Sequence, residues 1–512
     1  MSVFNKDNVA FLTSVSELTY CNPFLPRRTE LERILLGSDA EASDSVWSYR
    51  ATAGNLWHNT QAISKLLQPM AEQIRAELVG GAKVSPEHLR LYEDLIHYML
   101  YDRYRSLIWD FDQGGKTQTD CKTVWEQFLT DIQYYVADRG SELQFTLLNQ
   151  PAHLFACYFQ ISRLFHYVFF WVVGSSSAAA KLRSAIWQSV LTHNLRRYVG
   201  SLYCCMGDIP TLITGPSGTG KELVANAIAM AQYIEFDPAA GAFKGDYRQS
   251  YLAVNLAAMS PTLIESELFG HKKGAFTGAT NDRKGLFETC PPHGTVFLDE
   301  IGELDSGIQV KLLRVLQSRK FQRLGDLEER KFTGKLVAAT NRDLAEEMQS
   351  GQFRQDLYYR LCADRIETPT LSEQLTSQPE DLHNLVEYLA NQLTDENHGA
   401  EIADEVMKWI TENLGASYAW PGNVRELEQC IRNIIIRGEY RPANYRETTV
   451  RQQMATDFLN GSLTVDELLQ RYCTMVYSQT GSYEESARRL KIDRRTVKSK
   501  VDEALLETLN AG

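Results

Sequence analysis

The sequence predicts a multidomain protein with a mostly α-helical N-terminal domain, a central α/β core with a helical lid, and a helical C-terminal domain. Three observations support this fold class. Aromatic and aliphatic residues recur at helical spacing through the first third of the chain. Short apolar segments then alternate with helical patterns, which is typical of a parallel sheet covered on both faces. A basic helix-turn-helix pattern ends the chain.

Composition and charge narrow the class of protein. With 512 residues and 44% hydrophobic content, the chain can bury several cores. The net charge of -12 argues against a protein that coats nucleic acid over its whole surface, although a local basic face would suffice for DNA binding. The nine cysteines include no CxxC pair, so we expect reduced thiols rather than zinc or disulfides.

The sequence favours a cytoplasmic protein that does not cross a membrane. The first six residues lack the basic start and apolar run of a signal peptide. The apolar stretch 164–173 is shorter than the roughly 20 residues needed to span a bilayer, and Gln160, Arg163 and His166 interrupt the pattern. A buried helix is the better interpretation.

Residues 1–172 form the predicted helical N-terminal domain, to which we assign a regulatory or sensory role. The short buried strands of a phosphate-accepting receiver domain are not found in it. Trp109, Tyr98, Tyr101 and Tyr104 could line a pocket, but their helical spacing favours core packing.

The α/β core is predicted over residues 173–370, after the small-residue stretch 174–178. Its strands are expected at 209–214, 294–298 and 335–340. In such sheets ligands bind at the carboxyl ends of the strands. A helical lid follows at 371–440, with a helix from Val424 to about Arg437, and a polar linker at 441–462.

A glycine-rich loop follows the first strand and opens a helix, so its backbone N–H groups can cradle phosphates. Lys221 would neutralise the terminal phosphates, and Glu222 stands where Ser or Thr usually holds Mg²⁺. An ordinary glycine-rich turn is the alternative, and the flanking strand and helix argue against it. The loop consists of Gly215, Pro216, Ser217, Gly218, Thr219, Gly220, Lys221 and Glu222.

Two carboxylates end the second predicted strand. Asp299 can hold Mg²⁺, and Glu300 can polarise the attacking water. Acidic residues at strand ends are often only helix caps. The accompanying phosphate loop favours catalysis, with ATP and Mg²⁺ as cofactors.

Between these two motifs lies a glycine-bracketed Phe-Thr tip, which is typical of a loop that contacts another molecule. We call this segment the contact loop; it consists of Gly274, Ala275, Phe276, Thr277, Gly278 and Ala279.

The last predicted domain, 463–512, carries the helix-turn-helix. Residues 488–500 include seven basic residues and one acidic residue, which favours DNA binding. The alternative interpretation is a solvent-exposed basic helix that binds no partner. The second helix can meet phosphates and base edges in a major groove. Its candidate DNA-binding residues are Arg494, Arg495, Thr496, Lys498 and Lys500.

At these motifs the region from about Val173 to Arg437 resembles the AAA+ ATPase domain of sigma-54-dependent transcription activators, the bacterial enhancer-binding proteins. The phosphate loop ending in Gly-Lys-Glu, the run 265–279 and the run 298–304 carry the resemblance. It implies that the contact loop engages sigma-54 in the RNA polymerase holoenzyme. It also implies ATP hydrolysis in a homo-oligomeric ring, by analogy a hexamer. The C-terminal segment is similar to the Fis-type module of this family.

The resemblance also implies roles for single residues. Asn255 matches the residue that pairs with the catalytic glutamate, and Asn341 matches the sensor near the γ-phosphate. Arg354 and Arg360 match the fingers that a neighbouring subunit supplies, where a guanidinium stabilises transition-state charge. Arg425 matches the lid arginine that senses nucleotide in its own subunit.

This sequence departs from the family pattern in several places. Pro216 stands where Glu is usual, Leu256 where Cys is frequent, and 370–374 replaces an arginine-containing stretch. The last departure removes charge where the sheet domain meets the lid. Residues 235–250 are long for this position, which suggests a surface insertion.

The predicted function is an ATP-hydrolysing activator that binds an upstream, enhancer-like DNA site and remodels a sigma-54 polymerase complex. Two alternatives remain. One is a DNA-binding repressor that keeps the ATPase fold only as an oligomerisation scaffold. The other is an AAA+ remodeller of a different protein client.

Overall fold

The computed structural model describes residues 4–41, 47–48, 57–113, 120–136, 144–394, 396–415, 418–442, 463–502 and 505–506. The chain divides into two compact units, Met1–Ile435 and Ile436–Gly512, and each is described by itself. Most of the predicted linker, residues 443–462, lies outside the described residues.

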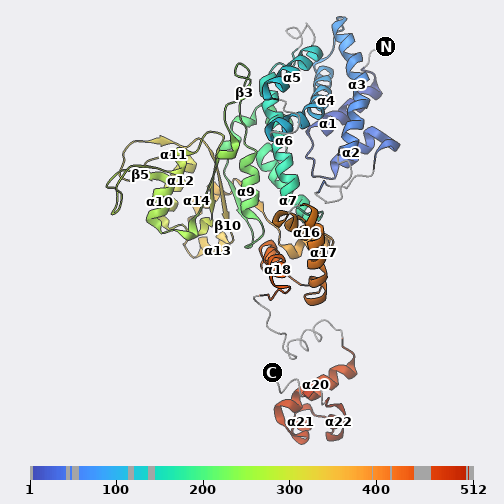
Figure 1. Cartoon of the computed structure of the whole chain (residues 1–512), viewed down its shortest axis with the longest axis vertical. Coiled ribbons are helices and arrows are strands. Elements are labelled where there is room, and N and C mark those ends of the chain that lie inside the picture. The colour runs from blue at the N-terminus through green and yellow to red at the C-terminus, as the bar shows by residue number, and fades with distance from the viewer. Residues whose placement is uncertain are drawn as a thin grey trace. The chain divides into compact units, whose positions relative to one another are not determined.

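The first unit begins with helices, as predicted (Figure 1). Their aromatic and aliphatic faces pack against one another, and α6 is buried over most of its length. Within the described part of the chain, no helix is long and apolar enough to cross a membrane. The helices are α1 (Lys6–Tyr20), α2 (Arg27–Leu36), α3 (His58–Val79), α4 (Pro86–Gln113), α5 (Cys121–Val136), α6 (Pro151–Trp171), α7 (Ser177–Leu191) and α8 (Leu195–Gly200).

A five-stranded sheet follows, with strand order β11-β1-β10-β7-β4 and parallel pairing throughout. This confirms the predicted α/β core, in which the three expected strands are β1, β7 and β10. The central strands β7 and β10 are almost entirely buried, since helices cover both faces. The strands are β1 (Thr211–Thr214), β4 (Tyr251–Asn255), β7 (Thr295–Asp299), β10 (Lys335–Thr340) and β11 (Asp364–Glu367).

Helices pack on both faces of this sheet, where α9 shares one hydrophobic cluster with α6 and α7, and the remaining core helices form a second cluster. Ile213, Phe297 and Val337 from the sheet lie in the first of these clusters together with Val168 and Ile186 from α6 and α7. The core helices are α9 (Lys221–Met230), α10 (Pro261–Phe269), α11 (Leu286–Thr289), α12 (Ser306–Ser318), α13 (Leu344–Gln349) and α14 (Gln355–Leu361).

Among the described residues, three short antiparallel hairpins accompany the main sheet. The segment 235–250 forms the first of them, and our expectation of a surface insertion is wrong for its aromatic side chains. Phe236 and Tyr247 are buried in the core of the N-terminal helices, because apolar rings gain by leaving water. The hairpins are β2 (Phe236–Asp237) with β3 (Ala242–Phe243), β5 (Gly270–His271) with β6 (Arg283–Lys284), and β8 (Lys320–Phe321) with β9 (Arg330–Lys331).

The helical lid is present as predicted. It consists of α15 (Leu371–Ser377), α16 (Asp381–Leu393), α17 (Glu396–Asn413) and α18 (Asn423–Arg437). The stretch 370–374, where the sequence departs from the family, starts α15 with a capping box. The Thr370 hydroxyl accepts from the Glu373 N–H at 3.1 Å, and Glu373 accepts from the Thr370 N–H at 2.8 Å.

The second unit contains α20 (Val465–Thr480), α21 (Tyr483–Leu490) and α22 (Arg494–Lys500). Lys491 has a φ of 57° at the end of α21, and Asp493 caps α22, so the chain turns tightly between the two helices. Val497 is buried, and Ala487, Leu490, Ile492 and Val501 are half-buried. The predicted helical C-terminal fold is confirmed.

Candidate nucleotide site and contact loop

The phosphate loop joins β1 to α9 and needs glycine at two positions for space as well as conformation. Gly215 has a φ of 147°, and a Cβ there would lie 2.2 Å from the Thr368 hydroxyl. Gly218 has a φ of 79°, and a Cβ there would lie 2.3 Å from the Gly422 carbonyl oxygen of the lid. Any side chain would therefore push the loop away from its neighbours.

Lys221 is the first residue of α9 and folds back over the loop. Its Nζ donates to the carbonyl oxygens of Gly215 at 3.0 Å and Pro216 at 3.1 Å. Burial lowers the pKa of Lys221, and the charges of Glu300 and Asp299 oppose that shift. A cation thus faces the two carboxylates at the carboxyl ends of the strands.

Three adjacent strands bring the predicted polar residues together. Asn255 lies opposite Asp299 in the β4–β7 register, and its Nδ2 donates to Asp299 Oδ2 at 3.2 Å. Glu300 has a φ of 56°, and its carboxylate accepts from the Asn341 N–H at 3.3 Å. The sequence suggested that Asn255 pairs with the glutamate, whereas here its hydrogen bond goes to the neighbouring aspartate.

These residues surround a cavity of about 660 Å³ that Lys221, Asn255, Asp299, Glu300 and Arg425 line together. Seven further residues line the cavity that were not predicted as site residues, because they come from α6, α9, α16 and α18 and carry no phosphate-binding or catalytic motif. They are Trp171, Leu223, Asn226, Tyr388, Gln392, Val424 and Glu428.

The lid holds the phosphate loop through the start of α18. Asn423 donates from Nδ2 to the Ser217 carbonyl oxygen at 3.0 Å and accepts from the Leu371 N–H at 2.9 Å. The Val424 N–H donates to the Gly218 carbonyl oxygen at 3.1 Å, and Arg425 donates to the Ser217 hydroxyl at 3.0 Å. We call these contacts the lid clamp.

Arg425 of the lid clamp was predicted from the sequence, but Asn423 was not. The sequence signal for Asn423 is its place in the turn 420–423, because asparagine tolerates a left-handed conformation better than most residues, and here its φ is 55°.

The two arginines assigned to a neighbouring subunit lie at α14. Arg354 is 44% exposed and pairs with Asp356 at 2.7 Å, and Arg360 is exposed. The cavity of the same chain is lined by other residues. An exposed ion pair of this kind contributes little to stability, so Arg354 can exchange its partner at small cost.

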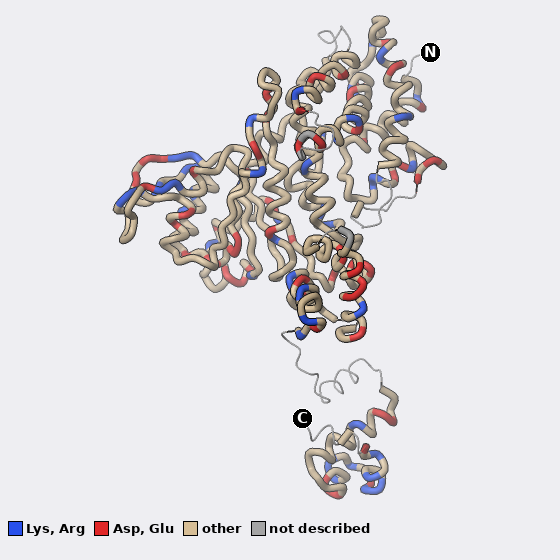
Figure 2. Tube along the Cα trace, in the orientation of Figure 1, with Lys and Arg blue, Asp and Glu red and all other residues tan. Residues whose placement is uncertain are grey.

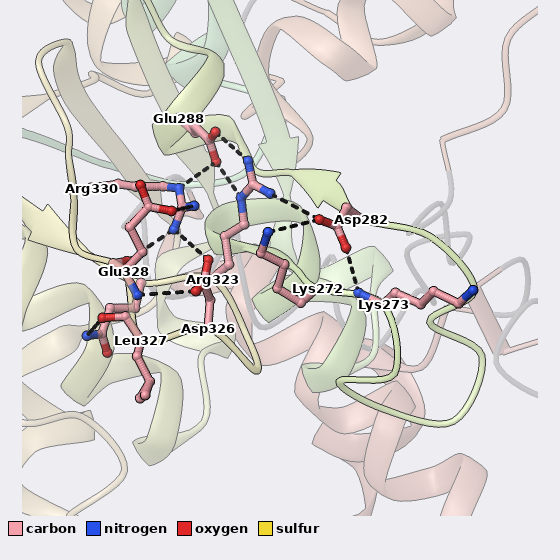
Figure 3. A network of polar contacts seen from close by, with 10 residues as sticks. Lys272, Lys273, Asp282, Glu288, Arg323, Asp326, Leu327, Glu328 and Arg330 are labelled. Carbon is pink, nitrogen blue, oxygen red and sulfur yellow. Dashed lines mark hydrogen bonds and ion pairs between the residues drawn. The ribbon is translucent and has the colours of Figure 1, made fainter.

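The contact loop lies between β5 and β6, and a network of ion pairs surrounds its base (Figure 3). Asp282 accepts from Lys272 Nζ at 3.0 Å and from the Lys273 N–H at 2.8 Å. Arg323, from the loop between β8 and β9, donates to Glu288 on α11 at 2.7 Å, and its guanidinium lies 4.0 Å from the Asp282 carboxylate. Two hairpins are thus tied together at the root of the contact loop.

The tip itself is open. Gly274 and Gly278 have φ values of 83° and 104°, and a Cβ at either would meet no heavy atom within 4 Å. Backbone conformation, rather than crowding, therefore favours glycine there. Thr277 is exposed, and the half-buried Phe276 ring lies 5.0 Å from the His271 ring in an edge-on contact.

In the second unit, basic residues lie on α21 and α22 (Figure 2). Arg494 pairs with Glu484 at 3.0 Å, and Lys500 pairs with Asp466 at 2.9 Å. Arg495 and Lys498 are exposed, and Thr496 is half-buried.

Comparison with known proteins matches these regions to two family models. Residues 192–367 match the Sigma-54 interaction domain, and residues 377–443 match the AAA+ ATPase lid domain. The transcriptional regulatory protein ZraR of Klebsiella oxytoca is 37% identical over 302 residues, which are 57% of this chain and 63% of that protein. The Nif-specific regulatory protein of Azotobacter vinelandii is 43% identical over 229 residues, which are 44% of this chain and 40% of that protein.

A crystal structure of NtrX from Brucella abortus in complex with ATP aligns with a TM-score of 0.39 and 23% identity, over 71% of this chain and 76% of that one. The chain spans less than two thirds of the length of ZraR and of the Nif-specific regulatory protein, the two curated relatives named above. The matched core and lid are those of an AAA+ ATPase with a Sigma-54 interaction domain, and the two curated relatives named above are regulatory proteins.

Proposed function

We propose that this protein is an ATP-hydrolysing transcriptional regulator that binds upstream DNA and remodels the closed complex of sigma-54 RNA polymerase. The observation that carries the proposal is the joint placement of Lys221, Asp299, Glu300 and Arg425 around one cavity. An exposed loop tip belongs to the same sheet domain.

The cavity suits a magnesium nucleotide. The N–H groups of the phosphate loop and Lys221 would hold the phosphates. Mg²⁺ takes only one or two protein carboxylates when phosphate oxygens and water complete its shell, so Asp299 suits that role. Glu300 would orient the attacking water, and Asn341 holds its carboxylate from the next strand.

Hydrolysis in this proposal requires a neighbouring copy of the chain. Arg354 and Arg360 lie on the exposed side of α14, where each could reach the phosphates bound by an adjacent subunit. A guanidinium there would stabilise the charge that develops on the phosphoryl oxygens. A closed homo-oligomeric ring, by family analogy a hexamer, would supply such an arginine to every cavity.

A continuous segment connects the cavity with the contact loop. Asn255 ends β4, α10 follows, and β5 then leads into the loop. A change in the contact between Asn255 and the strand-end carboxylates would therefore move α10 and the loop root. The exposed Thr277 and the adjacent Phe276 would transmit this movement to sigma-54.

The C-terminal unit supplies the proposed DNA contact. Exposed Arg495 and Lys498, together with Arg494, Thr496 and Lys500, would meet the phosphates and base edges of a major groove. The surface ion pairs of Arg494 and Lys500 are weak enough for DNA phosphates to replace them.

The decisive experiment measures ATP hydrolysis and open-complex formation for the wild type and for Thr277→Ala. We expect the variant to hydrolyse ATP and to lose open-complex formation, since Thr277 is exposed and distant in sequence from the nucleotide motifs. Thr280→Ala changes another exposed threonine just beyond the loop and should keep both activities.

Normal open-complex formation by Thr277→Ala would refute the role of the loop. A wild-type protein that binds DNA but hydrolyses no ATP at any protein concentration would favour the repressor scaffold. Hydrolysis without any effect on sigma-54 polymerase would favour a remodeller with another client.

A further inference from the structure

The N-terminal helices enclose a second cavity, of about 130 Å³, away from the motifs discussed above. Its wall is mostly aromatic and aliphatic, with side chains from α1, α2, α3, α4, α6, α7 and α8. Tyr98 and Tyr101, for which the sequence favoured core packing, line this cavity together with Trp47, Trp57 and Phe165. A cavity of this size can hold a single small aromatic molecule, because an apolar cavity of about 150 Å³ in another protein binds benzene.

One polar atom in this wall lacks a partner. His97 on α4 is only 4% exposed, and its Nε2 makes no hydrogen bond with the described residues. A buried nitrogen without a partner is costly, and such groups call for an explanation. His97 lines the cavity, so a bound molecule could supply the missing hydrogen bond.

The neighbours of His97 decide what that molecule must offer. Burial raises the pKa of Asp94, whereas its ion pair with Arg196 opposes that shift and favours the carboxylate. The Tyr20 hydroxyl donates its single hydrogen to Asp94 at 2.9 Å and lies 3.0 Å from His97 Nδ1. Nδ1 must then donate to the Tyr20 oxygen, which leaves Nε2 as a bare acceptor. Burial also lowers the pKa of His97 to about 3, so the ring is neutral.

The charged residues of the wall are already matched. Arg28 and Glu32 form a buried ion pair at 2.6 Å, and Asn59 donates to Glu32 at 3.0 Å. The Arg28 guanidinium also lies 4.0 Å from the centre of the Trp47 ring. The cavity therefore needs no charge from its occupant.

We propose that this cavity binds a small, neutral, flat ring compound that carries one hydrogen-bond donor, placed against His97 Nε2. The apolar wall supplies most of the affinity, and the donor supplies selectivity. Binding at this site does not depend on the ATPase function proposed above.

The position of α6 connects this site with the phosphate loop. One side of α6 contributes Cys157 and Ile161 to the cavity. From the same helix, Gln160 and Arg163 donate to carbonyl oxygens at the end of α9, at distances of 2.6–2.9 Å. Lys221 of the phosphate loop begins α9, and α6 holds the opposite end of α9. A molecule in the cavity therefore contacts α6, which in turn contacts α9.

Calorimetric titration of the full-length protein with indole and with indene tests the proposal. The two molecules have nearly the same shape, but only indole carries an N–H donor. We expect indole to bind one-to-one and about tenfold more tightly, which corresponds to about 1.4 kcal/mol. Absence of indole binding, or equal affinities for the two molecules, would overturn the proposal.

A variant then locates the site. His97→Phe keeps an aromatic ring and removes the acceptor, so the preference for indole should disappear. His193→Phe replaces an exposed histidine and should keep the preference. A folded His97→Phe protein that still prefers indole tenfold would also overturn the assignment. The comparison in the wild type stands even where the variant fails to fold.

Discussion

Replacing Asn423 by alanine tests how far the lid supports the nucleotide site. Asn423 is buried at the start of α18, and its amide group bridges two segments. The Nδ2 group binds the Ser217 carbonyl of the phosphate loop, and Oδ1 binds the Leu371 N–H at the start of α15. Asn423→Ala therefore removes a contact from the loop and one from the lid in a single change.

The size of the effect follows from these contacts. Each hydrogen bond contributes about 0.5–1.5 kcal/mol, and more where the remaining partner stays buried. Alanine at a φ of 55° adds about 1 kcal/mol of backbone strain relative to asparagine. The sum is about 2–4 kcal/mol of lid docking. If half of this free energy, about 1–2 kcal/mol, is lost from nucleotide binding, the Kd for ADP rises by about 5- to 30-fold.

Calorimetric titration with ADP measures this change directly. Gln429→Ala is the matched control, because Gln429 is an exposed amide on the same helix and its loss should leave the Kd unchanged. A folded Asn423→Ala protein with a Kd within twofold of the wild type would show that the lid clamp does not support nucleotide binding.

Two further variants test other parts of the fold. Burial lowers the pKa of Lys335, at the start of β10, to about 8. Between pH 8 and about 10.4 the unfolded chain therefore holds more protons than the folded protein. The free energy of unfolding of the wild type rises by roughly 3 kcal/mol over this pH range. Lys335→Met should lack this gain in urea unfolding at pH 7.5 and 10.5, and an equal pH dependence of both proteins would contradict the assignment. Phe236→Ala removes a ring within 4.8 Å of the Trp125 ring and should lower unfolding free energy by about 3–5 kcal/mol, whereas the 92% exposed Leu327→Ala should change it by less than about 0.5 kcal/mol. A small effect of Phe236→Ala would mean that the hairpin does not hold the N-terminal helices.

The features that the sequence predicted well are those carried by contiguous residues. The glycines of the phosphate loop and the strand ending in Asp299 can be recognised from a few neighbouring residues, which determine both their conformation and their chemistry. The fold class followed from the same local patterns, and the parallel sheet confirms it. The surface location expected for segment 235–250 was wrong for Phe236 and Tyr247, because the length of the segment gave no information on where these rings would pack.

Local motifs in the chain were therefore enough to indicate an AAA+ core with a helical lid and a helical C-terminal unit, since turns, caps and strand ends depend on neighbouring residues. The lid clamp, the aromatic lining of the nucleotide cavity and the cavity beside His97 depend instead on packing. Asn423 and Ser217 are 206 residues apart, and Tyr20 and His97 are 77 apart. Such pairs come into contact only after the helices have buried their apolar faces, so no local sequence pattern could predict them.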